Sequence, residues 1–251
     1  MSDNQNATAA EFNSQARVAH FMINGIYNKI RNTALAPPAA ELYAATLPHI
    51  GEVTQLNCAG ESVTIACRDG MGDHLDREIV KGEQPVLQEL IDSVSRNDVF
   101  WDVGGHLGVY SSFVGQRVDQ VVAFEPNTSR RAILKRNLKK NNVEGIVRSD
   151  FLGDGSSDSV TTDSLDLPTP TMMKMDIEGG ELAALKGMRE LLQKVGLQLL
   201  FVELHPASAV GSWGLSEAEC NTVRTLLRSA GFTVSDVGQR GGQSFIRAKK
   251  D

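Results

Sequence analysis

The chain has 251 residues, of which 41% are hydrophobic and 22% carry charged side chains. These values suit a globular protein with one sizeable domain, and no stretch approaches the roughly 18 consecutive apolar residues that a membrane-spanning helix needs. The net charge of −6 argues against a nucleic-acid partner, because proteins that contact the phosphate backbone broadly usually present a basic face.

The N-terminal residues and the cysteine content indicate in which cellular compartment the chain is expected. The first residues are polar and lack the basic start and apolar run of a signal peptide. Cys58, Cys67 and Cys220 cannot all pair, and none belongs to a Cys-x-x-Cys motif, so neither a disulfide framework nor a zinc site is expected. We therefore predict a cytoplasmic location.

Residues 1–95 are predicted to form a cap of helices and one β-hairpin. Apolar residues recur there with helical spacing, and two short alternating segments flank the turn-forming pair Ala59-Gly60. The expected elements are helices over residues 12–30, 39–47 and 85–94, and a hairpin that pairs residues 53–57 with 62–67.

Residues 96–251 are predicted to form an α/β domain. Short apolar segments alternate with amphipathic ones, which indicates a mostly parallel sheet covered by helices. The last two segments lie close together around a glycine-rich turn, so the sheet should end in an antiparallel hairpin. The seven expected strands cover residues 99–103, 120–124, 145–149, 171–176, 197–204, 232–237 and 244–248, and the helices cover 110–117, 129–140, 181–194 and 217–229.

A glycine-rich turn follows the first of these strands. Asp102 ends the strand, and Gly104 and Gly108 allow the backbone to turn sharply and to approach a ligand closely. Glu125 ends the next strand, where a carboxylate can accept hydrogen bonds from both ribose hydroxyls of an adenosine. The pair predicts an adenosine-cofactor site; the alternative is a tight strand–helix connection with a surface glutamate.

The spacing of the glycines distinguishes between adenosine cofactors. The nicotinamide fingerprint requires G-x-G-x-x-G, and counting from Gly104 places His106 and Val109 at the later glycine positions. The sequence instead has the D-x-G-x-x-x-G spacing of methyltransferases. Binding of S-adenosylmethionine is therefore expected in preference to NAD.

Five segments together resemble the FkbM-type methyltransferases, with Lys174–Glu181 (KMDIEGGE) the most specific of them. The resemblance implies a Rossmann-like class I methyltransferase fold, S-adenosylmethionine as methyl donor, and an oxygen acceptor on a small molecule, sugar or glycolipid. The sequence departs from many members at His106, where asparagine is frequent, and at Gly105, where alanine is common. The segments are Asp76–Pro85, Asp102–Gly108, Phe124–Asn127, Lys174–Glu181 and Phe201–Pro206.

The resemblance also implies which residues touch the cofactor. Asp102, Gly104, Gly108 and Glu125 would do so. Glu83 lies just before the first strand of the domain and is expected to fold over the methionine end of the cofactor; the alternative is an acid at the N-terminus of a helix. The acid that faces the adenine is less defined, because the loop before residue 171 is short and rich in glycine and serine. Asp150 is preferred to Asp154, since it follows a strand end and precedes an apolar residue.

Two carboxylates bracket the end of the strand at residues 171–176. Asp176 and Glu178 could share one face and point toward the acceptor, because ligands of open α/β sheets bind beyond the carboxyl ends of the strands. We predict both as catalytic. The alternatives are that Asp176 caps the helix beginning near Glu181 and that Glu178 forms an ion pair with Lys174 or Arg189.

His205 is the third predicted catalytic residue, because its ordinary pKa lies near neutrality and suits a general base; the alternative is a loop residue before a proline. Glu203, Asp176 and Glu178 could together hold a divalent metal, but their spacing is not diagnostic, and no metal is predicted. Trp213 either lines the acceptor pocket or packs in the interior.

The predicted function is therefore O-methylation of a hydroxyl on a small molecule, sugar or glycolipid by S-adenosylmethionine. Two alternatives are an NAD-linked oxidoreductase and a non-catalytic scaffold that binds an adenosine cofactor. The acceptor and the oligomeric state are not defined by the sequence.

Overall fold

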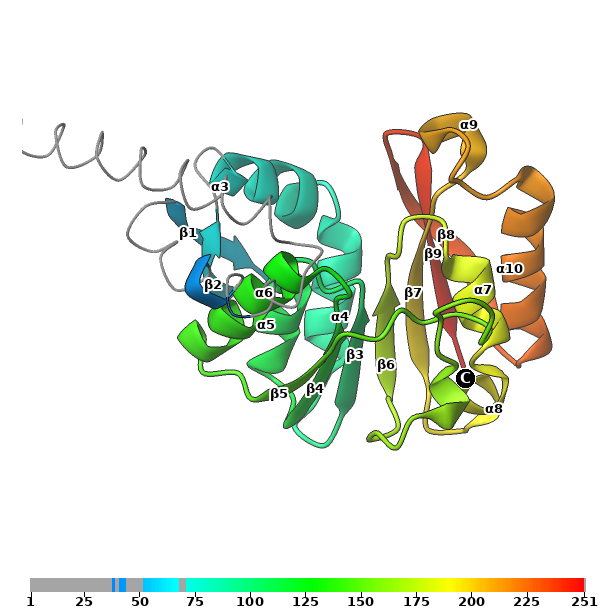
Figure 1. Cartoon of the computed structure of the whole chain (residues 1–251), viewed down its shortest axis with the longest axis horizontal. Coiled ribbons are helices and arrows are strands. Elements are labelled where there is room, and N and C mark those ends of the chain that lie inside the picture. The colour runs from blue at the N-terminus through cyan, green and yellow to red at the C-terminus, as the bar shows by residue number, and fades with distance from the viewer. Residues whose placement is uncertain (1–37, 39–40, 44–51, 68–70, 251) are drawn as a thin grey trace, which may run out of the picture.

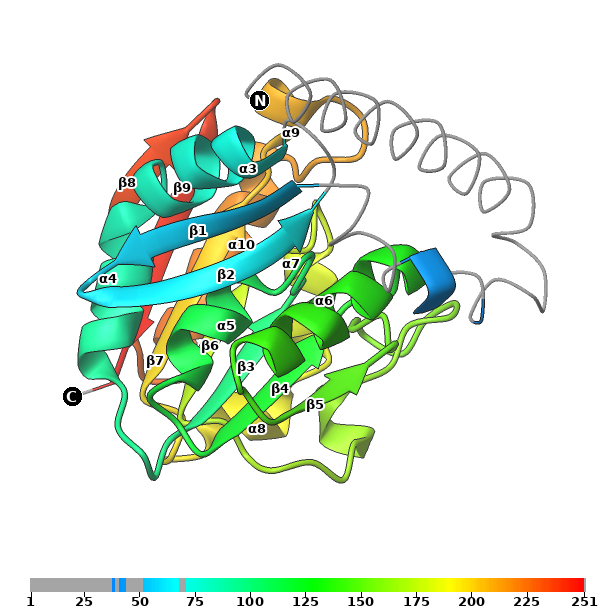
Figure 2. The same cartoon turned by 90° about the vertical axis from the view of Figure 1, so that its left-hand side faces the viewer.

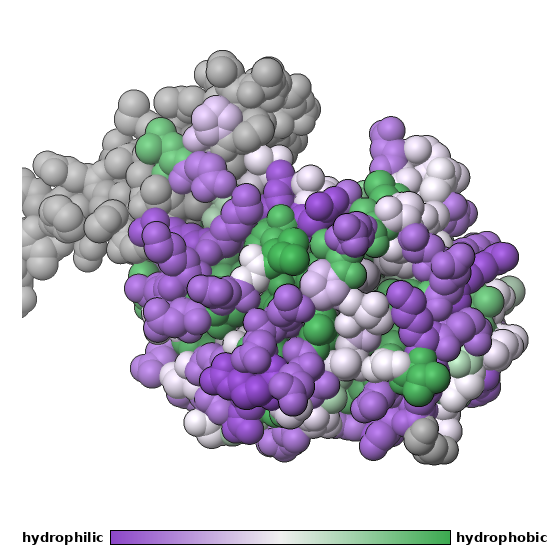
Figure 3. Space-filling view, turned by 90° about the horizontal axis from the view of Figure 1, so that it is seen from below, coloured by the Kyte–Doolittle hydropathy of each residue, from purple (hydrophilic) through white to green (hydrophobic). Residues whose placement is uncertain are grey.

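The computed structural model describes residues 38, 41–43, 52–67 and 71–250. The predicted helix over residues 12–30 lies outside the described residues, as does most of that over 39–47. None of the helices in the described ranges is long and apolar enough to cross a membrane. On the face shown in Figure 3, hydrophilic residues cover much of the surface, with smaller hydrophobic areas between them.

A seven-stranded sheet forms the centre of the molecule (Figure 1). Its order is β5-β4-β3-β6-β7-β9-β8, and β9 runs antiparallel to both of its neighbours. The predicted mostly parallel sheet with a C-terminal antiparallel hairpin is confirmed. The strands are β3 (Val99–Val103), β4 (Gln120–Phe124), β5 (Gly145–Arg148), β6 (Met172–Met175), β7 (Leu199–Leu204), β8 (Thr233–Arg240) and β9 (Gln243–Lys249).

Helices cover both faces of the sheet. α4, α5 and α6 lie on one side and α7, α8 and α10 on the other, and each side has its own buried apolar cluster. Phe100 of β3 points into the first cluster and Trp101 into the second, as expected for successive residues of a strand. The helices are α3 (Met71–His74), η1 (Leu75–Lys81), α4 (Gln84–Ser93), α5 (Val109–Gly115), α6 (Thr128–Lys140), α7 (Glu181–Lys186), α8 (Arg189–Gln193), α9 (Ala207–Val210) and α10 (Glu217–Ser229), with a short 3-10 turn, η2 (Thr162–Ser164).

The predicted hairpin is present as β1 (Glu52–Cys58) and β2 (Glu61–Cys67) (Figure 2). β2 packs against α5 and α6, and β1 packs against α3, η1 and α4. The side chain of Asn137 on α6 accepts a hydrogen bond from the backbone N–H of Ala66 and donates to the backbone oxygens of Ala66 and Leu107. The hairpin thus shares a core with the helices of the sheet domain, and the boundary near residue 95 stays a prediction. No disulfide joins the three cysteines, all of which lie in the described ranges.

Two local features differ from the sequence expectations. The helical segment formed by α3 and η1 was not expected, although it walls one side of the central cavity. The helix predicted over 181–194 is split into α7 and α8 at Gly187. A Cβ at this position would come within 1.8 Å of the backbone oxygen of Gly153, so the close contact requires glycine at the break.

Candidate active site

A cavity of about 780 Å³ lies beyond the carboxyl ends of β3, β4, β6 and β7. Parallel strands of an open α/β sheet place their ligands at this edge. Most of the residues predicted for the site line it, and the opposite wall comes from the η1 segment, the β8–β9 turn and the loop after α9. The lining residues from the predicted set are Asp102, Gly104, Glu125, Asp150, Asp176, Glu178 and His205.

Asp102 is buried at the end of β3 and holds the start of α5. Its Oδ2 accepts hydrogen bonds from the backbone N–H and the hydroxyl of Ser111, at 3.1 and 2.6 Å. Its Oδ1 is buried without a hydrogen-bond partner. Burial raises the pKa of this carboxyl above its ordinary value, against the opposing effect of the Lys174 ammonium. One carboxylate oxygen therefore remains for a ligand that donates a hydrogen bond.

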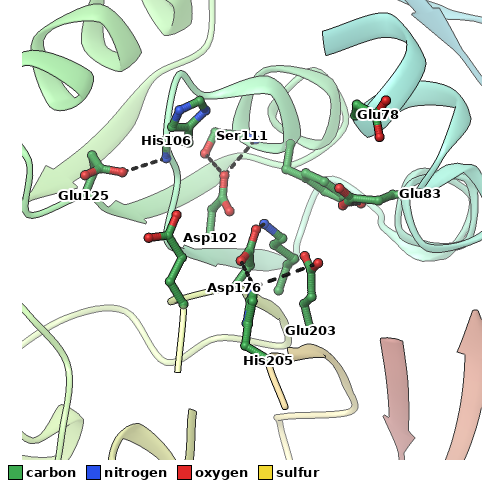
Figure 4. A network of polar contacts seen from close by, with 12 residues as sticks. Glu78, Glu83, Asp102, His106, Ser111, Glu125, Asp176, Glu203 and His205 are labelled. Carbon is green, nitrogen blue, oxygen red and sulfur yellow. Dashed lines mark hydrogen bonds and ion pairs between the residues drawn. The ribbon is translucent and has the colours of Figure 1, made fainter. Parts of the chain in front are cut away.

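Glu125 is held in place by two loops (Figure 4). Its Oε2 accepts a hydrogen bond from the backbone N–H of His106 at 2.9 Å, and its Oε1 accepts one from the backbone N–H of Asn127 at 2.8 Å. Burial raises its pKa, although these hydrogen bonds oppose the shift. Because each carboxylate oxygen can accept more than one hydrogen bond, both can still receive ligand hydroxyls.

The two glycines of the turn play different structural parts. Gly104 lines the cavity with φ +88°, and a Cβ there would come within 1.8 Å of the backbone oxygen of Asp176. Gly108, with φ +83°, precedes α5 and packs against Leu134, outside the cavity lining. Gly104 is thus required by the neighbouring strand end.

His106 stands between these glycines with φ +48° and also lines the cavity. Burial lowers its pKa to about 4, and the positive charges of Arg130 and Lys174 act in the same direction. The ring is therefore neutral at physiological pH.

Asp150 lines the cavity, and its Oδ2 accepts a hydrogen bond from Arg148 Nε at 2.6 Å. Asp154 lies in an exposed turn, bonded to Ser156, and does not line the cavity. The geometry thus favours Asp150 over Asp154 as an acid that faces a ligand.

Glu83 lies behind the cavity wall in a network with the β8–β9 hairpin. It accepts a hydrogen bond from Tyr110 Oη at 2.8 Å and forms an ion pair with Arg240 at 2.9 Å. Arg240 also donates to Glu203 Oε1 at 3.1 Å and to the backbone oxygen of Glu78 at 3.0 Å. Burial raises the pKa of Glu83 and of Glu203, the latter to about 7. Glu83 therefore anchors the hairpin and is not itself among the lining residues.

Asp176 follows β6 directly and faces the cavity. Its Oδ2 lies 2.9 Å from the buried Lys174 ammonium, which sits 4.7 Å from the centre of the Tyr110 ring. Burial alone would raise the pKa of Asp176, but the Lys174 charge outweighs it and keeps the pKa below its ordinary value. Asp176 does not cap α7, whose N-cap is Gly180.

His205 follows β7 and is almost completely buried. Its Nδ1 donates a hydrogen bond to Glu181 Oε1 at 2.7 Å, and its Nε2 lies 3.6 Å from Asp176 Oδ1 (Figure 4). Burial would lower its pKa, but Glu181 outweighs it and raises the pKa. Trp213, half-exposed at the rim, lies 5.7 Å from the imidazole, ring centre to ring centre.

Glu178 lies in the loop beyond β6. Because the strand ends at Met175 and Glu178 has φ +53°, the expectation that Asp176 and Glu178 share a strand face does not apply. Glu178 still lines the cavity, and its exposed side chain lies 4.0 Å from Arg130. That ion pair replaces the ones expected with Lys174 or Arg189.

The sequence expectations missed two residues of this site. Glu181 is part of the KMDIEGGE string but was read only as a helix start, whereas it holds His205 from the opposite side of the ring. Arg240 falls at the end of β8, in a segment expected to be a turn. The place of Glu181 in the KMDIEGGE string was the sequence signal that could have identified it. Arg240 lies in no motif, so no sequence signal pointed to it.

Part of the chain is similar to known methyltransferases. The Methyltransferase FkbM domain matches residues 156–234. The hexuronic acid methyltransferase AglP of Haloferax volcanii is 28% identical over 155 residues, which cover 50% of this chain and 64% of that relative. The chain is thus similar to FkbM methyltransferases over part of its length. It spans slightly less than two thirds of the length of this curated relative.

Solved structures share the fold of this chain. A magnesium protoporphyrin IX methyltransferase from Synechocystis PCC 6803, solved with bound S-adenosylmethionine, matches with a TM-score of 0.51 and 14% identity, covering 73% of this chain and 86% of that one. An rRNA methylase from Streptococcus thermophilus matches with a TM-score of 0.50 and 12% identity, covering 67% and 95%. The predicted Rossmann-like class I methyltransferase fold is confirmed. The oxidoreductase and scaffold alternatives find no support in the FkbM domain match or in AglP.

Proposed function

We propose that this chain transfers a methyl group from S-adenosylmethionine to a hydroxyl oxygen of a sugar or glycolipid. The observation that carries the proposal is the single cavity that brings together two sets of side chains. Asp102 and Glu125 lie at the ends of β3 and β4, and Asp176 and His205 lie at the ends of β6 and β7. In this proposal the first pair serves the cofactor and the second pair serves the acceptor.

The residues on the β3–β4 side fit the cofactor. Glu125 has carboxylate capacity left for two ribose hydroxyls, and the unpartnered Oδ1 of Asp102 can accept from the amino group of the methionine moiety. Asp150, Phe151 and Leu152 line the adjoining wall, where an acid and apolar side chains suit an adenine. Gly104 and Gly108 would shape the backbone turn beside the cofactor, and Glu83 would hold the wall behind it.

The cofactor supplies a methyl group that is already electrophilic, because it is carried on a sulfonium. The protein then has mainly to align the acceptor oxygen and receive its proton. Asp176 and His205 face the cavity for that purpose, and a positioned base contributes about 10²–10⁴-fold in rate. Glu178 also lines the cavity, and its exposed side chain would contact the solvent-facing side of the acceptor.

A sugar acceptor is supported by the rim of the cavity and by the relative. Trp213 presents a half-exposed aromatic face beside His205, which suits the apolar face of a sugar ring. AglP acts on a hexuronic acid, as its name states. Uronic acids and their glycosides are therefore the first acceptors to test.

The experiment is incubation of the protein with methyl-labelled S-adenosylmethionine and a panel of uronic acid glycosides, followed by mass spectrometry. We expect a labelled methyl ether, and turnover reduced 10²-fold or more in Asp176→Asn at unchanged cofactor affinity. Asp154→Asn, in an exposed turn outside the cavity, is the matched control and should retain full turnover. Equal activity of Asp176→Asn and the wild type would refute the catalytic assignment, and label found only on nitrogen or carbon would refute O-methylation.

A further inference from the structure

Three side chains of different chemistry converge at the ends of β6 and β7. His205 Nε2 lies 3.6 Å from Asp176 Oδ1 and 4.0 Å from Glu203 Oε1, and one ligand atom from each residue falls within 4.8 Å of the others. Figure 4 shows the two carboxylates directed at the imidazole. Asp176 and His205 also line the cavity, so this cluster is open on one side.

The spacing between these atoms is too long for direct hydrogen bonds, which need about 2.7–3.2 Å. It does suit two ligands of one ion. With metal–ligand bonds of about 2.0–2.2 Å, two ligand atoms on the same ion lie about 3–4 Å apart. The 3.6 and 4.0 Å from His205 Nε2 fall within that range, and the two carboxylates lie within 4.8 Å of each other. Glu203 Oε1 also accepts from Arg240, so its Oε2 is the oxygen left for an ion.

Neighbouring contacts leave ligand atoms of His205 and Glu203 without hydrogen bonds. Glu181, which is outside the cluster and completely buried, binds His205 Nδ1 and so leaves Nε2 as the free nitrogen in a neutral ring. A carboxylate behind a ligating histidine is the usual partner in metal sites. Glu203, 2% exposed, keeps its Oε2 without a hydrogen-bond partner.

The charges around the cluster do not balance. Five carboxylates either act electrostatically on Lys174 or bind His205, and two cations lie among them; with all five carboxylates ionised and His205 neutral, the excess is three negative charges (5 − 2). Burying unpaired charge is costly, so the excess calls for protons or a bound cation. The carboxylates are Glu83, Asp102, Asp176, Glu181 and Glu203, and the cations are Lys174 and Arg240.

We propose that Asp176, Glu203 and His205 bind one divalent metal ion on the acceptor side of the cavity. The set differs from the one considered from sequence, because His205 takes the place of Glu178. One imidazole and two carboxylates suit Mn²⁺ or Zn²⁺, and Mn²⁺ is the probe of choice. Because Asp176 and His205 line the cavity, an ion held by them would be able to meet an oxygen of the acceptor. This last role rests on the proposed function, whereas binding of the ion does not.

The test is titration of chelator-treated protein with Mn²⁺, followed by the electron paramagnetic resonance signal of the free ion. We expect one ion per chain, at least tenfold weaker binding in His205→Ala and in Glu203→Gln, and displacement by Zn²⁺. Glu78→Gln removes a cavity-lining carboxylate outside the ligand set and should bind Mn²⁺ like the wild type. Glu181→Gln should weaken binding about 10–100-fold, through the orientation of His205.

Two outcomes overturn the site. One is wild-type protein that binds no stoichiometric Mn²⁺ or Zn²⁺, which would leave protonation of His205 to balance the charge. The other is equal loss of binding in Glu78→Gln and His205→Ala. Binding of S-adenosylhomocysteine, measured on the same samples, shows that each variant is folded and separates this proposal from the previous one. Cofactor binding without metal binding refutes the metal site alone, and metal binding without cofactor binding refutes the methyltransferase proposal.

Discussion

The backbone oxygen of Asp176 lies against Gly104 so closely that a Cβ on residue 104 would come within 1.8 Å of it. The backbone N–H of Asp176 donates to the oxygen of Val103 at 2.9 Å, immediately before that glycine. The turn expected to touch the cofactor and the carboxylate expected to act on the acceptor are thus joined through their backbones. A change at Gly104 should therefore disturb both halves of the site.

Gly104→Ala should lower the free energy of unfolding by about 2 kcal/mol or more, because it adds a clash to a strained backbone conformation. The measurement is urea-induced unfolding of the variant and the wild type. Gly60→Ala is the matched control: residue 60 also has a positive φ, +78°, but a Cβ there has nothing within 4 Å. If the two variants lose equal stability, the contact with Asp176 contributes nothing.

Glu125→Ala should weaken binding of S-adenosylhomocysteine by about 1.5–3 kcal/mol, or roughly 10- to 150-fold, because hydrogen bonds to a charged acceptor are lost. Calorimetric titration measures the change. The exposed Glu144 provides the control, since Glu144→Ala removes an equal charge far from the cavity lining. Unchanged affinity in Glu125→Ala would mean that this carboxylate serves only to tie its two loops together.

Asp150→Ala should weaken binding of S-adenosylhomocysteine several-fold, whereas Asp154→Ala should not. Asp150 lines the cavity and Asp154 lies outside it in an exposed turn. The same titration, repeated with adenosine alone, tells whether the loss belongs to the adenosine half. A loss in Asp154→Ala without one in Asp150→Ala would reverse the assignment.

The lowered pKa of His106 predicts that the stability of the folded chain depends on pH. Burial lowers this pKa from 6.5 to about 4 in the folded chain, so between these values the unfolded chain binds a proton that the folded chain does not. The contribution of His106 to stability is therefore complete above pH 6.5 and falls as the pH drops toward 4. By linkage it amounts to about 3 kcal/mol at most.

Unfolding measured from pH 7.5 to 4.5 on the wild type and on His106→Asn isolates this contribution. The wild type should lose more stability than the variant as the pH falls, and NMR titration of the imidazole should give a pKa well below 6. Parallel curves for the two proteins, or an imidazole that titrates near 6.5, would show that His106 is solvated.

The strand ends of the site could be predicted from sequence because their signals are local. Asp102 and Glu125 each end a short apolar segment, and parallel pairing brings such ends to one edge of the sheet. The same reasoning placed Asp176 and His205 there. The expectation that Glu178 shares a strand face with Asp176 was wrong, because β6 ends at Met175.

The partners of these residues could not be predicted, because they depend on contacts between distant segments. Arg240 meets Glu83 and Glu203 only after β8 and β9 are paired at the sheet edge. Likewise, the break between α7 and α8 falls at Gly187, where the backbone of residue 153 passes close by, which helical periodicity does not record. Local sequence patterns thus located the strand-end residues of the site, whereas tertiary packing determines which charged side chains pair with them.

Calorimetric titration of the purified chain with S-adenosylhomocysteine, with NAD in a parallel cell, tests the central claim most directly. The account predicts one site per chain for S-adenosylhomocysteine with a micromolar Kd, equivalent to about −8 kcal/mol, and no heat of binding for NAD. Clear binding of NAD together with no binding of S-adenosylhomocysteine would contradict it.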